Sequence, residues 1–300
     1  MKIRSGLKIR TRWGRLRSAF EQIETHDELD RLRQAVGRLE ARQLIPPKPG
    51  LAGQEFSVYS QGGEDGIIQF LIHNIAVPRR IFVEFGVQDY REANTRFLAV
   101  NDGWAGLIMD SDPANIRAIR SHRHGWRLNV TAAQAFVTRE NINQLLVDHG
   151  ISGEIGLLSI DIDGNDYWVL EAIDAVSPAI LIVEYNYRFG ADRAVVVPYD
   201  PAFERAKAHP SRIYFGASLK ALCKLAEKKG YEFVGCNEFG VNAFFVRSDL
   251  MTDELRKLTS EAAYVEGTFR EAFGPDGRPG SIDHDEERRI LKDLPVVELA

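Results

Sequence analysis

The segment SIDIDGNDYW, from Ser159 to Trp168, carries a cluster of polar residues directly after an apolar run, GEIGLL. Burying several carboxylates without partners is costly in free energy, so we expect these side chains to face a ligand, a cation or both. The polar residues are Asp161, Asp163, Asn165 and Asp166.

Ordinary loop chemistry also fits this segment. Asp163 and Asn165 flank Gly164 as in a turn, and Asp166, just before YWVLEAI, suits a helix cap. A calcium loop of the helix-loop-helix kind does not fit. Its glycine stands at the sixth position, whereas Gly164 is the fourth residue counted from Asp161.

Acidic residues also stand at the ends of other apolar runs that resemble strands. One run leads into EFGVQDYREANT, Glu84 to Thr95, and the next ends at Asp110. A later run ends in EYNYRFG, with Glu184 and Asn186. In an open α/β sheet, ligands bind beyond the carboxyl ends of the strands. Acids at four strand ends therefore predict one site at that edge of the sheet.

The elements that would position these residues alternate between strand and helix from about residue 55. Short apolar runs suit parallel strands covered on both faces, and they stand at 80–86, 105–110, 154–162 and 179–185. Helical patterns lie between them, at 92–102, 113–121, 139–149 and 166–175. The alternation predicts an open α/β sheet, and YEFVGCNEFGVNAFFVR, at 231–247, adds an antiparallel hairpin at one edge.

The composition is that of an ordinary globular protein, with 300 residues, 44% hydrophobic and 27% charged. The net charge of −5 gives no reason to expect nucleic acid as a partner. The two cysteines, Cys223 and Cys236, are too few for a disulfide framework or a zinc cage, so a cytoplasmic location is expected. No apolar run is long enough for a membrane span, and the N-terminus lacks the apolar core of a signal peptide.

Four parts of the chain differ in pattern. Residues 1–45 are expected to form a basic, amphipathic helix, and 46–54 a linker that contains most of IPPKPG. Residues 55–250 carry the α/β pattern. Residues 251–300 are expected to form a C-terminal helix and a charged tail, loosely attached from about residue 274.

The N-terminal helix has one apolar face, whose residues Leu29, Leu32, Val36 and Leu39 follow a 3-4-3 spacing. Three uses of this helix stay open. It could pair with other copies in a homo-oligomer, pack on its own domain, or touch an anionic membrane surface. In the last case Trp13, Leu16 and Phe20 would enter the interface beside the arginines of the opening segment.

The turn after the first strand limits the choice of cofactor. A dinucleotide fingerprint needs glycines at its first, third and sixth places, but GVQDYR offers Gly86, Gln88 and Arg91 there. Asp110 stands 24 residues after Gly86, which suits a grip on ribose hydroxyls, although it could also cap the next helix. A single-nucleoside cofactor without phosphates fits better, which indicates S-adenosylmethionine.

Six segments together resemble the FkbM-type branch of class I S-adenosylmethionine-dependent methyltransferases, many of which act on sugars, glycans or natural products. The segments are YSQGGEDGIIQFL, FVEFGVQDYREANT, GWAGLIMDSDP, LLSIDIDGNDYWVLEAI, IVEYNYRFG and YFGASLKALCKLAEKKGYEFVGCNEFGVNAFFVR, within about residues 55–250. The resemblance implies an α/β, Rossmann-like, seven-stranded, mostly parallel sheet with an antiparallel C-terminal hairpin and helices on both faces. The N-terminal helix is added to this domain.

The resemblance also assigns roles to individual positions. Glu84 and Gly86 resemble contacts to the methionine end of the cofactor, and Asp110 resembles the ribose-binding acid. The full set of cofactor-binding candidates is Gln61, Glu64, Glu84, Gly86, Asp89, Asn94, Thr95, Asp110 and Asp161. The chain departs from the family at Gln88 and Tyr90, where the motif usually carries further glycines.

The ends of the fourth and fifth strands resemble those of metal-dependent O-methyltransferases, which implies Mg²⁺ or another divalent cation. The candidate ligands are Asp161, Asp163, Glu184 and Asn186, an all-oxygen set that suits a hard cation. A cation would lower the pKa of an acceptor hydroxyl, and a base would take its proton. The candidate bases are Asp163, Asp166 and His209.

Together these predictions describe a cytoplasmic, metal-assisted O-methyltransferase that acts on a hydroxyl of a sugar or glycan acceptor. Residues of YNYRFGADR, at 185–193, are candidates for the acceptor pocket. Three alternatives stay open. The protein could be a non-catalytic binding or scaffold protein, which Gln88 and Tyr90 favour, a methyltransferase for a small hydroxylated natural product, or a transferase that needs no metal.

Overall fold

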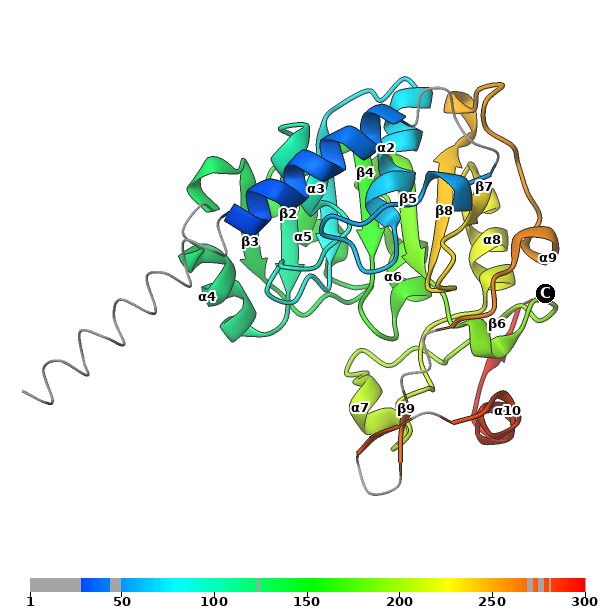
Figure 1. The fold of residues 1–300 in the computed structure, drawn as a ribbon. Coiled ribbons are helices and arrows are strands. Elements are labelled where there is room, and N and C mark those ends of the chain that lie inside the picture. The colour runs from blue at the N-terminus through cyan, green and yellow to red at the C-terminus, as the bar shows by residue number, and fades with distance from the viewer. Residues whose placement is uncertain are drawn as a thin grey trace, which may run out of the picture.

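The computed structural model of the chain describes residues 28–43, 50–122, 125–268, 272–274, 278–280 and 282–299. Its main sheet has seven strands in the order β3-β2-β1-β4-β5-β8-β7 (Figure 1). The strands are β1 (Ile81–Phe85), β2 (Ala105–Asp110), β3 (Val130–Gln134), β4 (Gly153–Ile160), β5 (Val176–Glu184), β7 (Tyr231–Cys236) and β8 (Asn242–Arg247). Neighbours from β3 to β5 pair in parallel, whereas β8 pairs antiparallel with both β5 and β7. The predicted fold class is confirmed, including the hairpin at the edge.

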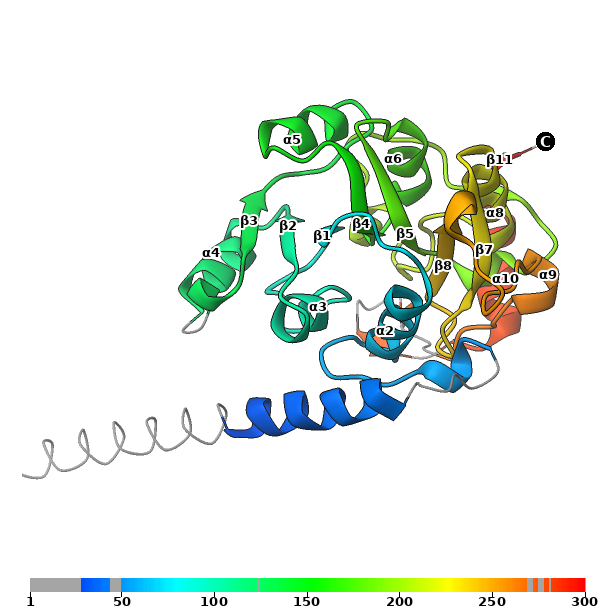
Figure 2. The ribbon, with the colours of Figure 1, turned by 90° about the horizontal axis from the view of Figure 1, so that it is seen from above.

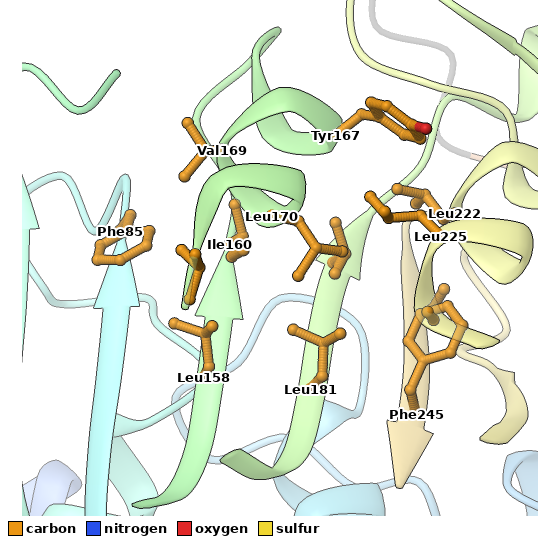
Figure 3. Packing of buried hydrophobic residues seen from close by; sticks show 14 of the residues in the cluster. Phe85, Leu158, Ile160, Tyr167, Val169, Leu170, Leu181, Leu222, Leu225 and Phe245 are labelled. Carbon is orange, nitrogen blue, oxygen red and sulfur yellow. The ribbon is translucent and has the colours of Figure 1, made fainter. Parts of the chain in front are cut away.

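Helices cover both faces of this sheet (Figure 2). One face carries α5 (Ile142–Asp148), α6 (Asp166–Ala172) and α8 (Leu219–Lys228), and the other carries α2 (Glu64–Asn74), α3 (Arg96–Asn101) and α4 (Pro113–Ser121). Figure 3 shows the first of these two cores, where Leu158, Leu181 and Phe245 from three strands face Leu170 of α6 and Leu222 of α8. Burying a side chain such as Leu158 contributes about 1.5–3 kcal/mol, so these contacts fix the strand ends relative to one another.

Short elements complete the described fold. They are η1 (Ala52–Gln54), η2 (Gly125–Arg127), η3 (Tyr187–Phe189), β6 (Val195–Val196), α7 (Arg205–Ala208), η4 (Ser248–Leu250), α9 (Ser260–Ala263), β9 (Ala272–Phe273), β10 (Pro279–Gly280), α10 (His284–Lys292) and β11 (Val297–Glu298). β3 was not among the predicted strands, because VTAAQ at the sheet edge is only partly buried and less apolar than its neighbours. α3 begins at Arg96 instead of residue 92, because the residues before it form a loop that Glu84 holds.

A helix over residues 28–43 packs on its own domain, along the side of α2 and α3 (Figure 2). At Gly37 a Cβ would lie 2.3 Å from Val58, so the helix and the domain are in close contact there. Gln34 donates to the hydroxyl of Tyr59 at 2.9 Å, and that hydroxyl donates to Asp30 at 2.9 Å.

The predicted apolar face of this helix is largely exposed, and part of it borders a groove beside Phe56 and Ser57. Its residues Leu29, Leu32, Val36 and Leu39 are 54–62% exposed. The closest contacts of the helix with the domain are instead at Gly37 and Gln34. The basic residues of the opening segment, Trp13 with its apolar neighbours, and residues 44–49 lie outside the described residues. None of the described helices is long and apolar enough to cross a membrane.

The C-terminal segment differs from the loosely attached tail that was expected. Apolar residues of and around α10, including Leu291, pack against Val195, Val197 and Ile213. β11 pairs with β6. The apolar face of α10 was not recognised in the sequence, because the segment is rich in charged residues. Most of these charges lie on the other side of the helix.

Candidate active site

A cleft of about 520 Å³ lies beyond the carboxyl ends of the parallel strands, where the sequence predicted the site. This volume suits a small-molecule ligand, for which pockets of about 300–1,000 Å³ are usual. The predicted site residues that line the cleft are Gln61, Gly86, Asp110, Asp161, Asp163 and Glu184.

Gly86 makes the turn that follows β1. Its φ of +75° lies in the left-handed region, and a Cβ there would stand 1.6 Å from the carbonyl oxygen of Asp161. Only glycine permits so close an approach of two strand ends. Gln88 and Tyr90 also have left-handed backbone, with φ of +48° and +60°. The loop therefore takes left-handed backbone at the two positions where the family motif usually carries glycines.

Glu84 supports this loop from inside the protein. Its carboxylate accepts hydrogen bonds from the backbone N–H groups of Asn94 and Thr95, at 2.9 and 3.0 Å, and from the Thr95 hydroxyl at 2.5 Å. Asn94 Nδ2 donates to the hydroxyl of Ser159 at 3.1 Å, which joins the loop to β4. Burial raises the pKa of Glu84 to about 7, although these hydrogen bonds act to lower it. Glu84, Asn94 and Thr95 thus position the loop from behind the cleft wall.

Asp110 ends β2 and faces the cleft. One of its oxygens accepts from the backbone N–H of Gln88 at 2.8 Å. The other accepts from the N–H of Asp112 at 2.8 Å and from Asn115 Nδ2 at 3.0 Å. The cap of α4 is Asp112, whose side chain accepts from the N–H of Ala114. Asp110 is therefore not needed as the helix cap, and the oxygen that Gln88 contacts has a further lone pair for a ribose hydroxyl.

The other cofactor candidates lie in different places. Gln61 is exposed at the rim of the cleft. Glu64 is buried at the start of α2 and accepts from Asn237 Nδ2 at 2.8 Å, so it ties α2 to the β7–β8 hairpin. Asp89 forms an ion pair with Arg91 at 3.2 Å, and the two side chains are 36% and 80% exposed. The structure does not place Glu64 or Asp89 on the cleft wall.

Three carboxylates meet at the ends of β4 and β5. Asp161, Asp166 and Glu184 each offer an oxygen within 4.8 Å of the others. Burial raises the pKa of Asp161 and of Glu184 well above their usual values, and the neighbouring carboxylates raise them further. Among the described residues, Glu184 Oε2 is buried without a hydrogen-bond partner. The cluster therefore contains a buried oxygen that could bind a cation or a hydrogen-bond donor.

Asp166 also shapes the loop that brings this cluster together. Its two oxygens accept from the backbone N–H groups of Ile162 and Gly164, at 2.8 and 2.9 Å. These bonds close the turn between β4 and α6. Burial raises the pKa of Asp166 to about 6. The sequence proposed Asp166 as a base or a helix cap, whereas the structure places it beside Asp161.

The two other predicted ligands, Asn186 and Asp163, make contacts of their own. The Nδ2 of Asn186 donates to the carbonyl oxygens of Ile213 and Phe215, at 2.8 and 3.0 Å, and its side-chain oxygen accepts from the N–H of Arg188. The amide is therefore already committed to holding a loop. Asp163 lines the cleft, but it is 56% exposed and contacts Arg205.

His209, a predicted base, lies away from the cleft wall. Its Nδ1 is 2.7 Å from the hydroxyl of Ser211 and accepts from the backbone N–H of that residue. These contacts stabilise the local turn, so the position of His209 matches an ordinary loop residue.

The far side of the cleft has a different chemistry, which the sequence did not reveal. Aromatic and arginine side chains from several loops form it, namely Tyr187, Arg188, Phe203, Arg205, Arg212, Phe215 and Phe273. Only the first two lie within the predicted acceptor segment, 185–193. The others come from loops and from the short elements α7 and β9, which are too short to give a periodic pattern, so no sequence feature could have placed them together.

The family is established by sequence. Residues 54–233, more than half of the chain, match the model of the methyltransferase FkbM domain. The fold and the site define a methyltransferase-type α/β protein, and the chain belongs to the FkbM methyltransferase family. No curated protein sequence matches the chain.

Solved methyltransferase structures are similar at low identity. The N-terminal domain of EvdMO1 with S-adenosylhomocysteine bound is 15% identical over 71% of this chain and 94% of that one, with a TM-score of 0.39. An S-adenosylmethionine-dependent methyltransferase from Clostridium acetobutylicum is 10% identical over 61% of this chain and 89% of that one, with a TM-score of 0.38. TrmK of M. capricolum, in complex with S-adenosylhomocysteine, is 12% identical over 65% of this chain and 74% of that one, with a TM-score of 0.38.

Proposed function

We propose that the protein is an S-adenosylmethionine-dependent O-methyltransferase that methylates a hydroxyl of a sugar or glycan acceptor with the help of Mg²⁺. The observation that carries this proposal is the single cleft. It joins the Gly86 turn and Asp110 on one side to the carboxylates Asp161 and Glu184 on the other. A nucleoside cofactor and an acceptor hydroxyl would therefore meet at the strand ends.

The cofactor half of the cleft suits a nucleoside with a short charged tail. Asp110 presents a carboxylate for the ribose hydroxyls, and the tight turn at Gly86 lets the ligand approach the backbone. Phe136 and Val137 add an apolar wall that suits a flat base, and Phe136 is 46% exposed there.

The acid cluster fits a divalent cation. Its donors are carboxylate oxygens, which suit Mg²⁺, and Glu184 Oε2 is buried with no partner among the described residues. Asp161, Asp166 and Glu184 would hold the ion, so Asp166 takes the place that the sequence gave to Asn186. The ion would supply Lewis acidity that lowers the pKa of the acceptor hydroxyl.

Methyl transfer breaks the bond between sulfur and the methyl carbon and forms a bond between that carbon and the acceptor oxygen. The hydroxyl proton must leave, and a base takes it. Of the three predicted bases, Asp163 is the one that lines the cleft, which supports its assignment as the base. The products are S-adenosylhomocysteine and a methyl ether.

Calorimetry with S-adenosylmethionine, followed by measurement of S-adenosylhomocysteine release with a panel of glycosides, tests the proposal. We expect binding, and turnover that EDTA abolishes and Mg²⁺ restores. Absence of cofactor binding would refute the proposal as a whole. Binding without turnover on any acceptor would favour the scaffold alternative, and turnover that is unaffected by EDTA would remove only the cation.

A further inference from the structure

One arginine on the acceptor side of the cleft has no anionic partner in the described part of the chain. Arg188 contacts Glu287 at 2.7 Å, and Arg205 contacts Asp163 at 2.5 Å. The guanidinium of Arg212 instead lies over the ring of Phe273, 3.8 Å from its centroid. Among the described residues no ion pair or side-chain hydrogen bond engages it, so its N–H donors are available to a ligand.

The backbone around Arg212 is held firmly in an unusual conformation. Its φ is +58°, in the left-handed region that an arginine seldom adopts. Its carbonyl oxygen accepts from Arg205 Nε at 2.6 Å, and its N–H donates to the carbonyl of His209 at 3.0 Å. Asn186 fixes the next residue through the carbonyl of Ile213. Non-glycine residues that surrounding contacts hold in such conformations cluster at ligand sites.

The guanidinium matches one kind of ligand group. Its planar fork of N–H donors complements a carboxylate or a phosphate, which it can bind through two parallel hydrogen bonds. The partly exposed rings of Phe203 and Phe273 line this end of the cleft and offer apolar surface for the carbon skeleton of a sugar ring. Arg212 lies on the acceptor side of the cleft, so a contact with it places the anionic group of an acceptor at that end.

We propose that the acceptor carries an anionic group, a carboxylate or a phosphate, and that Arg212 binds it while the reacting hydroxyl points to Asp161 and Glu184. This inference rests on the acceptor side of the cleft as assigned in the proposed function. The substrate class would be an acidic sugar, such as a uronic acid or a sugar phosphate.

The test uses the full-length protein, with and without saturating S-adenosylhomocysteine, and three probes: glucuronate, glucose 6-phosphate and glucose. Calorimetry or ligand-observed NMR should show that at least one anionic probe binds at least about tenfold more tightly than glucose. Arg212→Gln should weaken that binding by about tenfold or more. Arg79→Gln, at an exposed residue just before β1 and so at the edge of the sheet opposite the cleft, should leave it unchanged. The two anionic probes distinguish a carboxylate site from a phosphate site.

Each outcome decides the inference. Equal binding of glucose and both anions, or unchanged anion binding in Arg212→Gln, would refute it and leave Arg212 with a packing role on Phe273. The affinity for S-adenosylhomocysteine should be the same in both variants, which confirms that they fold. If Arg212→Gln does not fold, Arg212→Lys serves, because it keeps the charge but lacks the fork. If wild type does not bind S-adenosylhomocysteine, the proposed function fails, whereas the probes added alone still test Arg212.

Discussion

Replacing Gly86 by alanine should test how the site is built. The new Cβ would stand 1.6 Å from the carbonyl oxygen of Asp161, and an ordinary contact needs at least 3.4 Å. The ends of β1 and β4 must therefore separate by about 1.8 Å, or the turn must refold. Either change moves Asp161 relative to the turn that we assign to the cofactor.

The magnitude follows from two costs. Alanine in left-handed backbone costs about 1–2 kcal/mol, and overpacking adds typically about 1–3 kcal/mol. Gly103→Ala and Gly150→Ala are matched controls, because both glycines have positive φ, +66° and +72°, with nothing within 4 Å of the new Cβ. We expect a loss of about 2–5 kcal/mol of unfolding free energy for Gly86→Ala and about 1–2 kcal/mol for the controls.

Urea denaturation measures the stability, and calorimetry measures the affinity for S-adenosylmethionine. The controls should bind the cofactor as wild type does, whereas Gly86→Ala should bind at least about tenfold more weakly, equivalent to 1.4 kcal/mol. If Gly86→Ala and the controls lose the same free energy and keep the same affinity, the close approach of the two strand ends does not constrain the site, and the reasoning is wrong.

Three further predictions concern the buried pair, pH and assembly. Glu287→Gln leaves the buried Arg188 guanidinium without its carboxylate and should lower the free energy of unfolding, measured by urea denaturation, by about 3–5 kcal/mol. Arg193→Gln breaks the exposed pair with Glu298 and should cost less than about 1 kcal/mol, so similar losses in the two variants would contradict this prediction. Folding raises the pKa of Glu84 from 4.5 to about 7, so the folded state holds this proton more tightly than the unfolded state does. The contribution of Glu84 to the free energy of unfolding is therefore fully present below about pH 4.5, and up to about 3 kcal/mol of it is lost as the pH rises through 7. Glu84→Gln lacks this loss, so its stability deficit relative to wild type should narrow from pH 5 to pH 8, and a constant deficit would contradict the raised pKa. We propose that the exposed apolar face of the N-terminal helix joins two copies; Leu32→Asp, at a site 62% exposed, should then lower the mass seen by light scattering, and an unchanged mass would contradict this.

The sheet could be predicted because most of its strands are short apolar runs that can be recognised from their own residues. Apolar runs such as 105–110 coincide with β2, and the hairpin at 231–247 appears as β7 and β8. The edge strand β3 was not predicted, since an edge strand needs fewer apolar residues. The C-terminal segment was misjudged because α10 presents a narrow apolar stripe within a charged sequence, and only its contact with β6 and neighbouring loops explains the stripe.

The candidate site could be predicted only where strand ends supply its residues. Asp110, Asp161 and Glu184 terminate strands or follow them directly, so sheet topology alone brings them to one edge. The role of Asn186 was not predictable, because its partners are backbone carbonyls of a loop 27 and 29 residues further along the chain. The position of Arg212 in the cleft depends on contacts of the same loop, and these contacts do not follow from any periodic pattern in the sequence.

The segment after the family match contributes Phe273 to the cleft, and the Arg188–Glu287 pair fastens α10 beside it. Six of the seven aromatic and arginine residues on the acceptor side of the cleft, Arg212 among them, lie within the family match, and Phe273 alone comes from the segment after it. Exchanging the chain after β8 would therefore replace the ring beneath the Arg212 guanidinium and the carboxylate partner of Arg188, while both arginines keep their places in the sequence. A chimera cut between β8 and α9 would thus separate the contribution of this support from that of the arginines themselves.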